Sequence, residues 1–499
     1  MLSSPHTRGI RGAVTVEENT ESAIVDAACR LTQAIIEQNE LKQSEIACML
    51  FTVTQDLDAA FPAAGARKAG LTQTALMCTN EIPVADSLEK CIRVLTLVST
   101  DLKQEEIRHV YLGKAAALRP DWVDSAETEA LPTTTPPFPT PSFRPTILDI
   151  LPYQPGKPIS ELKRERDLND VIKLASNENP LGPSPKALKA IKNVLNSLHI
   201  YPDGSCFELR QKLAQRFNVD GTQLLFGNGS DEVIKMFGLT FLESGDKVLF
   251  CEPTFSEYTY ATKLMGASKH TAPLADYAFD LNALLKAIDS STKLIFVCNP
   301  NNPTGAYLNH ADVARFLDKV PEHVLVVFDE AYYEYVTAED FVDSLSFVRE
   351  GRNVAVLRTF SKIYGLAGLR IGYGVAPKHI AELVHRVREP FNVNALAQIG
   401  ALAALDDEDH VEQSRRQNQA GKEYLYRELA DLNLEFIPTQ ANFIFFDLDQ
   451  NAGLVFEKLL DKGIICRKGE VFGCPTWLRV TIGTETENRR FISALKTIL

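Results

Sequence analysis

A proline-rich stretch in the first third of the chain limits how its 499 residues can fold. From Leu131 the segment reads LPTTTPPFPTPSFRP, and six of the fourteen residues from 132 to 145 are proline. Proline lacks a backbone donor and fixes φ, so this segment cannot join a helix or a central strand. We expect an extended linker over 131–146, between a domain over 1–130 and a larger domain over 147–499. The alternative, a ligand for a recognition domain, is not needed to explain a tract between two globular patterns.

The composition is typical of a globular chain with an acidic surface. Hydrophobic residues make up 45% of the sequence and the formal net charge is -13. The chain is therefore not disordered, and it offers no basic face to nucleic acid or to an anionic membrane. No apolar run reaches the roughly 20 residues of a membrane span, and no secretory signal is apparent. The nine cysteines show no metal-ligand spacing, so we expect reduced thiols, no metal and a cytoplasmic location.

The first domain mixes helical and strand patterns. Apolar residues from Ile24 to Ile35 follow the three-and-four spacing of an amphipathic helix. Three β-rich apolar runs cover 46–54, 92–100 and 110–118. This mixture predicts a compact α/β or α+β sandwich, and pattern alone does not identify the fold.

Five motifs stand out in this domain, namely RGIRGAVTVE at 8–17, Phe61-Pro62 with Arg67, CTNE at 78–81, KCIRV at 90–94, and IRHVYL at 107–112 with LRPD at 118–121. In their residues and their order they resemble the pseudo-barrel class of chorismate mutases. The resemblance implies an α/β pseudo-barrel, assembled as a trimer, that converts chorismate to prephenate. This rearrangement needs no nucleophile, so an enzyme acts by holding a compact conformer and stabilising developing charge.

The resemblance assigns the mutase chemistry to arginines and a few polar groups. Arg93 would face the ether oxygen that gains negative charge, and Arg11 would hold a carboxylate in a bidentate pair. Glu81, together with the backbone or thiol of Cys78, would hold the ring hydroxyl. Further substrate contacts would come from Arg67 of a neighbouring subunit, Tyr111 and Arg119. A lone arginine is usually a solvated charge, but their concentration in an acidic domain favours a site for a dianion.

After the linker, apolar β runs alternate with helical segments. Continuous apolar strands with helical crossovers predict a mostly parallel sheet flanked by helices on both faces. Ligands of such sheets bind at the carboxyl ends of the strands. Four motifs follow predicted strands there, namely GNGSDE at 227–232, NPNNPTG at 299–305, DEAY at 329–332 and TFSK at 359–362.

This set resembles the fold-type I pyridoxal-phosphate aminotransferases, which have a small C-terminal subdomain beside the large sheet. The sequence GLAGLRIG at 365–372, directly after the Ser-Lys pair, is the most specific signal, because it sets a lysine and a phosphate-binding arginine at a fixed interval. NPTG or GNGS alone is most often a turn or a loop. The group of histidinol-phosphate aminotransferases is indicated by ILPYQPGKP at 150–158, KLASNENPLGP at 173–183 and YPDG at 201–204.

The resemblance implies pyridoxal 5′-phosphate, held as a Schiff base on Lys362. Transamination needs an amine, an electron sink and a base, and Lys362 would supply both amine and base. Asp329 would pair with the pyridine nitrogen. Other expected contacts are Asn302 and Tyr332 at the phenolic oxygen, Tyr258 stacked on the ring, and a phosphate cup of Gly229, Ser230, Asp231, Ser361, Arg370 and, from the partner subunit, Tyr201.

The expected substrate contacts include two further arginines. Arg479 matches the arginine that receives the α-carboxylate of every substrate in this fold. Arg467 and Tyr153 match positions that meet the distal anionic end of the substrate, and Asn179 is expected to bind substrate as well. That anion could be the phosphate of histidinol phosphate or the second carboxylate of prephenate, and the sequence does not decide between them.

The fusion predicts a bifunctional enzyme of aromatic amino acid biosynthesis. It would convert chorismate to prephenate and transaminate prephenate, phenylpyruvate or 4-hydroxyphenylpyruvate with a donor such as glutamate. In one alternative, the second domain acts on imidazole-acetol phosphate. In another, the first domain is a regulatory ligand-binding module. We expect a homo-oligomer, because dimeric aminotransferases and trimeric mutases combine most simply as a hexamer.

Overall fold

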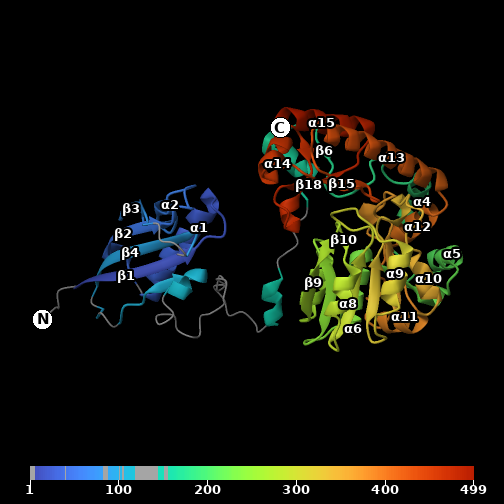
Figure 1. Ribbon diagram of the computed structural model, residues 1–499, viewed down its shortest axis with the longest axis horizontal. Helices are drawn as coiled ribbons and strands as arrows, with labels where there is room; N and C mark the ends of the chain where they lie inside the picture. Colours follow the sequence, from blue (N-terminus) through green and yellow to red (C-terminus); the bar gives the residue numbers. More distant parts are fainter. Residues whose placement is uncertain are drawn as a thin grey trace. The chain divides into compact units, whose positions relative to one another are not determined.

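The computed structural model describes residues 6–39, 41–82, 88–100, 102–103, 106–118, 144–150 and 156–499. The chain divides into two units, Met1–Ser142 and Phe143–Leu499, which Figure 1 shows in blue tones and in teal to red. Residues 131–143 of the expected linker lie outside the described residues, and Pro145–Asp149 form a 3-10 helix.

The described part of the first unit forms one mixed sheet of five strands in the order β3-β2-β4-β1-β5. Strand β4 pairs antiparallel with both β1 and β2, while the outer pairs β2–β3 and β1–β5 are parallel. The helices and strands are β1 (His6–Thr15), α1 (Glu21–Gln38), β2 (Ile46–Val53), α2 (Ala63–Lys68), β3 (Ala75–Asn80), β4 (Cys91–Thr100) and β5 (Val110–Leu112).

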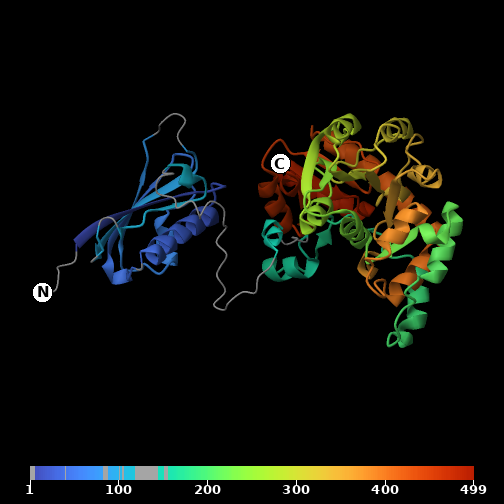
Figure 2. The same cartoon turned by 90° about the horizontal axis from the view of Figure 1, so that it is seen from below.

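Helix α1 covers one face of this sheet (Figure 2). Thr20 caps it by accepting a hydrogen bond from the backbone N–H of Ala23 at 3.3 Å, and its apolar face is buried as the spacing predicts. A Cβ on Gly12 of β1 would lie 2.9 Å from Ile35, so a glycine lets the helix approach this closely. The predicted run at 110–118 differs from the structure, because the strand ends at Leu112 and a 3-10 helix follows.

The opposite face of the sheet carries apolar side chains that nothing in the described part of this unit covers well. Leu95 and Met77 are 40% and 63% exposed. Both are in register with Leu50 of β2, so they share one face, and Arg11 is in register with Leu95. The same face therefore carries an apolar patch and an arginine that the sequence assigns to the mutase site.

The second unit contains a large sheet and a smaller C-terminal subdomain. Its helices and strands are α3 (Ile159–Arg166), β6 (Ile172–Lys173), α4 (Pro185–Val194), α5 (Phe207–Phe217), β7 (Leu224–Gly227), α6 (Ser230–Phe241), β8 (Lys247–Glu252), α7 (Glu257–Leu264), β9 (Ser268–Ala275), β10 (Ala278–Phe279), α8 (Leu281–Ala287), β11 (Thr292–Cys298), α9 (His310–Leu317), β12 (Leu325–Asp329), α10 (Ser344–Arg349), β13 (Val354–Thr359), β14 (Gly372–Val375), α11 (Lys378–Val384), α12 (Ala395–Ala404), α13 (Glu408–Asp431), β15 (Phe443–Asp447), α14 (Ala452–Asp461), β16 (Ile464–Ile465), β17 (Arg467–Lys468), β18 (Trp477–Thr481) and α15 (Glu485–Ile498).

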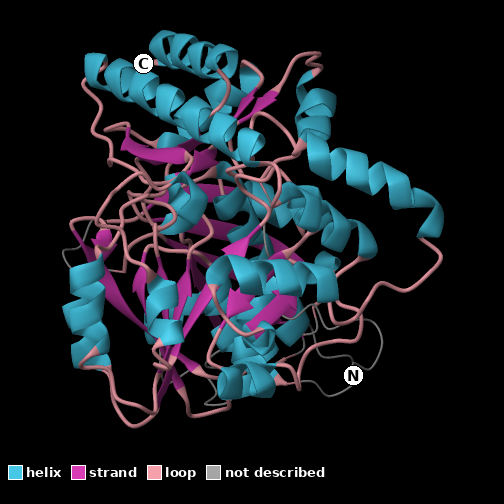
Figure 3. Cartoon of the chain, turned by 90° about the vertical axis from the view of Figure 1, so that its right-hand side faces the viewer, coloured by secondary structure: helices cyan, strands magenta, loops and turns pink. Residues whose placement is uncertain are grey.

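The large sheet has the strand order β10-β9-β8-β11-β12-β13-β14-β7. Strands β9, β8, β11, β12 and β13 are parallel, whereas β14 is antiparallel to both β13 and β7. All residues of β12 and β13 are buried, and helices flank the sheet (Figure 3). The predicted mostly parallel sheet is confirmed.

In the C-terminal subdomain, the described strands β15, β18 and β17 form a three-stranded sheet, and α13 and α15 run beside each other over it (Figure 1). The short strand β6 pairs parallel with β16, which ties the beginning of this unit to its end. Within the described residues, no helix is long and apolar enough to span a bilayer.

Candidate active sites

The first candidate site follows from strand register in the first unit. Arg93 of β4 is in register with Thr52 of β2 and with Ala13 of β1, and Ala13 is in register with Tyr111 of β5. Because paired residues point to the same face, Thr52, Arg93 and Tyr111 lie in one row. Glu81 follows β3, and its carboxylate forms an ion pair with Arg93 and accepts a hydrogen bond from the hydroxyl of Thr52. Sequence reasoning missed Thr52, and only the pairing of β2 with β4 reveals it.

Arg11 and Tyr111 lie close enough to Arg93 to affect its pKa. Burial is the main reason that the pKa of Arg93 lies below its usual value; Tyr111 raises that pKa, and Arg11 lowers it further. The backbone N–H of Arg11 donates to Nδ1 of His109 at 3.0 Å. Two guanidinium groups with one carboxylate leave an excess of positive charge, which suits an anionic ligand.

Two predicted mutase residues, Arg67 and Cys78, are not brought to this row. Arg67 is exposed on α2. Cys78 is in register with the buried Phe51 and packs against the core under α1, so its thiol points to the other face from Arg93. The expected thiol contact is therefore not formed within one protomer, while the Cys78 backbone belongs to β3. Arg119 lies outside the described residues.

The second candidate site is a cavity of about 220 Å³ in the second unit. It lies where β11, β12 and β13 end, as expected for ligands of a parallel sheet. The predicted residues that line it are Ser230, Asp231, Asn302, Asp329, Tyr332, Ser361, Lys362, Arg370, Arg467 and Arg479.

Asp329 is the last residue of β12 and is only 2% exposed. Its Oδ2 accepts a hydrogen bond from the hydroxyl of Tyr258 at 2.8 Å, whereas its buried Oδ1 has no hydrogen-bond partner among the described residues. Burial raises the pKa of Asp329 to about 6, and the Tyr258 hydrogen bond opposes this shift. A buried acceptor without a partner calls for a donor in the cavity, and the protonated ring nitrogen of pyridoxal phosphate is such a donor.

Lys362 presents its amine to the same cavity. Its Nζ lies 3.4 Å from the carbonyl oxygen of Ser176 and 5.6 Å from the ring centre of Tyr332. Burial, followed by the positive charge of Arg479, lowers the pKa of Lys362 to about 8. A lysine with a lowered pKa has more of its amine in the neutral, nucleophilic form.

Tyr332, Asn302 and Arg479 form a connected polar wall. The Tyr332 hydroxyl accepts a hydrogen bond from Nδ2 of Asn177 at 2.9 Å, and burial raises the pKa of Tyr332, so the hydroxyl keeps its proton. Arg479 donates to Oδ1 of Asn302 and, at 2.8 Å, to the carbonyl oxygen of Ala175. Sequence reasoning did not single out Asn177, although it lies in the KLASNENPLGP motif.

The N-terminus of α6 and Arg370 meet at one end of the cavity. Gly229 precedes the helix with a φ of 89°, and a Cβ there would lie 2.5 Å from Nη2 of Arg370. That same nitrogen is 2.5 Å from Oδ2 of Asp231. Helical N–H groups, a guanidinium and the buried Ser361 together suit a phosphate. Tyr201 does not line the cavity of its own protomer; it is 79% exposed.

Tyr258 lies behind the cavity instead of stacking over it. Its ring is fully buried and stacks on Phe296 with a centroid distance of 4.8 Å, while its hydroxyl is bound to Asp329. Phe255 of the same PTFSEY motif lines the cavity. The predicted stacking by Tyr258 does not fit this position, and Tyr258 instead positions Asp329.

Asn179 also lies outside the cavity lining. Its Nδ2 donates to the carbonyl oxygen of Ile363 at 2.7 Å and to the hydroxyl of Ser414 at 2.8 Å. The predicted substrate contact therefore does not fit, because this amide holds the loop directly after Lys362. Tyr153 lies outside the described residues.

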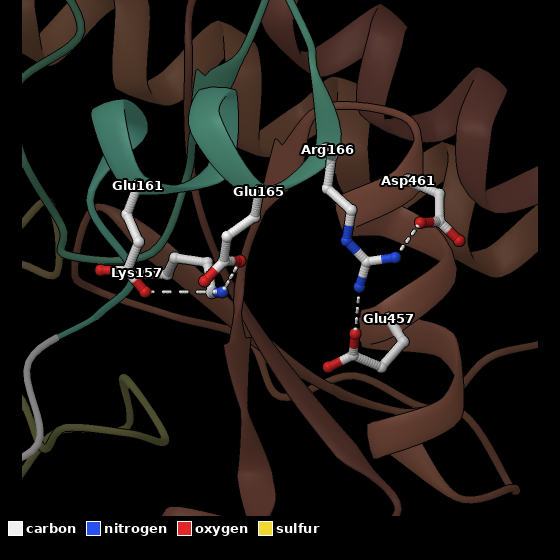
Figure 4. A network of polar contacts seen from close by, with 6 residues as sticks. All are labelled: Lys157, Glu161, Glu165, Arg166, Glu457 and Asp461. Carbon is white, nitrogen blue, oxygen red and sulfur yellow. Dashed lines mark hydrogen bonds and ion pairs between the residues drawn. The ribbon is translucent and has the colours of Figure 1, made fainter.

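Ion pairs fix helix α3 to α14 (Figure 4). Arg166 bonds Glu457 at 2.7 Å and Asp461 at 2.5 Å, while Lys157 pairs with two glutamates of α3 itself. Solvent screens each such pair, but together they hold the chain next to Gly156, which lines the cavity.

The fold and the cavity define a pyridoxal-phosphate enzyme of fold type I. Residues 169–495 match the family "Aminotransferase class I and II", and residues 7–122 match "Chorismate mutase type I". The chain belongs to the class I and II aminotransferases and carries a type I chorismate mutase domain before its aminotransferase domain. An isomerase domain and a transferase domain are thus joined in one chain, and the expected cofactor, pyridoxal phosphate, is confirmed.

Similar proteins agree with this assignment for the second domain. The chain is 53% identical over 360 residues to a histidinol-phosphate aminotransferase of Moorella thermoacetica, covering 72% of this chain and 93% of the relative. It is 48% identical over 357 residues to that of Caldicellulosiruptor saccharolyticus, covering 72% and 100%. Among solved structures, histidinol-phosphate aminotransferase of Sinorhizobium meliloti in complex with pyridoxal-5′-phosphate has a TM-score of 0.66 at 27% identity, covering 71% of this chain and 97% of that one.

Proposed function

We propose that the chain catalyses two steps of aromatic amino acid biosynthesis. The first domain would rearrange chorismate to prephenate, and the second would transfer an amino group to prephenate, phenylpyruvate or 4-hydroxyphenylpyruvate. The observation that carries this proposal is the fusion itself, because a domain that forms prephenate is joined to a domain that can aminate a keto acid.

In the mutase domain, the row around Arg93 supports a role in charge stabilisation. Arg93 would face the oxygen that becomes negative as the C–O bond breaks, and Arg11 would bind a carboxylate. Glu81 holds Arg93 in place and accepts from Thr52, so this carboxylate fixes the guanidinium before substrate arrives. Tyr111 would donate to the substrate, and the remaining negative charge would fall to Arg67 of a neighbouring subunit and to Arg119.

In the aminotransferase domain, the cavity residues would hold pyridoxal phosphate, which supplies the electron sink when bound. Oδ1 of Asp329 would keep its ring nitrogen protonated. The protonated Tyr332 hydroxyl and the amide N–H of Asn302 would donate to its phenolic oxygen, because Oδ1 of Asn302 already accepts from Arg479. Phe255 would contact the ring, and the phosphate would be bound by Ser361, Arg370 and the start of α6 at Gly229, Ser230 and Asp231, with Tyr201 of the partner subunit.

Lys362 would act as the amine that attaches the cofactor and as the base that moves a proton at the substrate α-carbon. Arg479 would bind the α-carboxylate, and Arg467, which also lines the cavity, would bind a second anion. A substrate with two anionic ends, such as prephenate, engages both arginines, and so does a keto acid that carries a phosphate.

A second candidate rests on the relatives. Both relatives described above are histidinol-phosphate aminotransferases, so imidazole-acetol phosphate is the competing substrate. Steady-state kinetics with prephenate, phenylpyruvate, 4-hydroxyphenylpyruvate and imidazole-acetol phosphate, with glutamate as donor, separate the two. We expect the highest kcat/KM with one of the first three. Amino transfer to imidazole-acetol phosphate alone would reject the aromatic proposal.

Assembly is part of the proposal. The open apolar sheet face with Leu95 and Met77 supports burial against further copies of the first domain, and the exposed Tyr201 supports pairing of the second. Closed symmetry joins trimers and dimers into a hexamer. Light scattering at working concentration tests this, and a dimer mass rejects it.

A further inference from the structure

A second, larger hollow of about 540 Å³ lies in the aminotransferase domain away from the cofactor cavity. None of its lining residues is among those that line the cofactor cavity. We call it the arginine cleft and define it by Arg216, Glu334, Arg349, Arg358, Tyr364 and Arg415. Four arginines in one hollow stand out in a chain with a formal net charge of -13. The sequence did not predict this cleft, since its defining residues come from α5, α10, β13, α13, the 3-10 helix Tyr333–Tyr335 and the loop that follows Lys362.

Two of the four arginines are already paired with carboxylates. Arg358 donates to Oε2 of the buried Glu330 through two nitrogens at 2.9 and 2.8 Å, and Arg349 bonds Asp343 at 2.7 Å. The arginines of both ion pairs lie in the lining of the cleft. The two remaining arginines, Arg216 and Arg415, are the candidates for binding a ligand.

Arg216 and Arg415 each donate to a backbone carbonyl, of Leu405 at 3.3 Å and of Glu334 at 2.6 Å. Among the described residues, neither forms an ion pair with a carboxylate. A guanidinium has five donors, so both arginines keep donors for a ligand. Guanidinium groups bind carboxylate and phosphate groups in a bidentate manner, so the two arginines suit the carboxylate of a ligand.

Glu334 adds a negative group to the same cleft. Its side chain is nearly buried, and in the described chain none of the arginines lies within ion-pair distance of its carboxylate. Burial raises the pKa of Glu334, while Arg358, Arg216 and Arg415 lower it. With Glu334 beside Arg216 and Arg415 the cleft holds groups of both signs, which suits a zwitterion better than a purely anionic ligand such as phosphate.

The walls of the cleft are aromatic. Phe217, Tyr333 and Tyr364 line it, and the guanidinium of Arg358 lies 3.4 Å from the ring centre of Tyr333. A flat apolar side chain can pack on such surfaces. We infer that the arginine cleft binds an α-amino acid with an aromatic side chain, with its carboxylate on Arg216 and Arg415 and its ammonium on Glu334.

The cleft and the cofactor cavity share two chain segments. Tyr332 lines the cavity, and the next two residues, Tyr333 and Glu334, line the cleft. Lys362 lines the cavity, and Tyr364 lines the cleft. A ligand in the cleft therefore contacts the same two segments that hold the cofactor, and we expect it to change the KM of the keto acid. This inference does not depend on which keto acid the enzyme prefers.

Isothermal titration with L-phenylalanine tests the inference. The full-length holoenzyme is first reduced with borohydride, so that the cofactor stays fixed on Lys362 and no half-reaction occurs. We expect one binding event per chain, weakened at least about tenfold in Arg415→Gln and in Glu334→Gln, because each removes a charged partner of the zwitterion. Arg416→Gln is the matched control. Arg416 is the next residue of α13 after Arg415, and its side chain is 77% exposed and pairs with Glu412.

Three results would overturn the inference. The first is equal affinity in Arg415→Gln and Arg416→Gln. The second is binding that disappears in Arg479→Gln instead, which would place the ligand in the catalytic cavity. The third is tighter binding of inorganic phosphate than of L-phenylalanine, which would make the cleft an anion site. Circular dichroism and cofactor absorbance verify that each variant is folded, and Arg415→Gln decides alone if Glu334→Gln does not fold.

Discussion

Replacing Asp329 by asparagine tests how the second domain activates its cofactor. The carboxylate lines the cavity and is buried; one oxygen is fixed by Tyr258 at 2.8 Å, and the other is buried without a hydrogen-bond partner among the described residues. Asparagine keeps the shape and removes the charge that holds the ring nitrogen protonated. Solvent does not screen a buried carboxylate, so the free energy lost in Asp329→Asn should equal that of breaking a buried charge pair.

Such a loss amounts to about 2–5 kcal/mol, which corresponds to a roughly 30- to 5,000-fold lower rate of amino transfer. The assay is the half-reaction with the amino donor, followed by the absorbance of bound cofactor. Asp340→Asn is the matched control, because Asp340 accepts a hydrogen bond from Tyr307 at the same 2.8 Å but lies at the surface. A rate in Asp329→Asn within about threefold of the unmutated enzyme, with cofactor bound, would refute the reasoning.

Tyr258→Phe refines the same test. The hydrogen bond from Tyr258 lowers the pKa of Asp329, which burial has raised to about 6. Without this hydrogen bond the pKa of Asp329 should be higher. The acidic limb of the plot of rate against pH should therefore shift to higher pH. An unchanged limb would show that Tyr258 does not tune Asp329.

Three further outcomes follow from the described contacts. Arg93→Ala should lower kcat for chorismate at least about a hundredfold while chorismate binding is largely kept. Arg30→Ala is the control, because Arg30 is exposed. If the unmutated protein does not turn over chorismate, the first domain is better explained as a sensor. Gly12→Ala should destabilise the first domain by about 1–3 kcal/mol, because the new Cβ would lie 2.9 Å from Ile35, and an unchanged melting temperature would contradict this. Cofactor capture by the cofactor-free enzyme should accelerate as the pH rises through about 8, where Lys362 loses its proton, and a flat profile would argue against the lowered pKa.

The sequence indicated the large sheet and most of its cavity because motif and strand are adjacent in the chain. Asp329 ends one buried strand and Lys362 comes three residues after another, so their place at the sheet edge could be predicted. The sequence could not predict which side chains of a short segment point into the cavity. Phe255 lies just before α7 and Tyr258 lies in its first turn, and the buried ring of Tyr258 packs against Phe296.

The same ambiguity explains the other differences. Asn177 and Asn179 lie in one loop, and although asparagine tolerates the left-handed φ of 56° found at Asn177, the residue type does not say which of the two amides faces the cavity. Cys78 and Thr79 alternate across a strand, so a one-residue difference in register decides which of them meets Arg93. The arginine cleft gave no signal because no two of its arginines share a motif.

The pairing of β6 with β16 sets an order for folding during synthesis. Ile172 of β6 can pair with Ile464 of β16 only after Ile464 has been synthesised. The smaller subdomain therefore cannot finish folding until nearly the whole chain has left the ribosome. The strands of the first domain pair over much shorter separations, the last ending at Leu112. The roughly 350 residues between these points take about 20–70 s to translate at about 5–20 residues per second. The mutase domain can therefore fold, and meet other copies of itself, while its own aminotransferase is still being made.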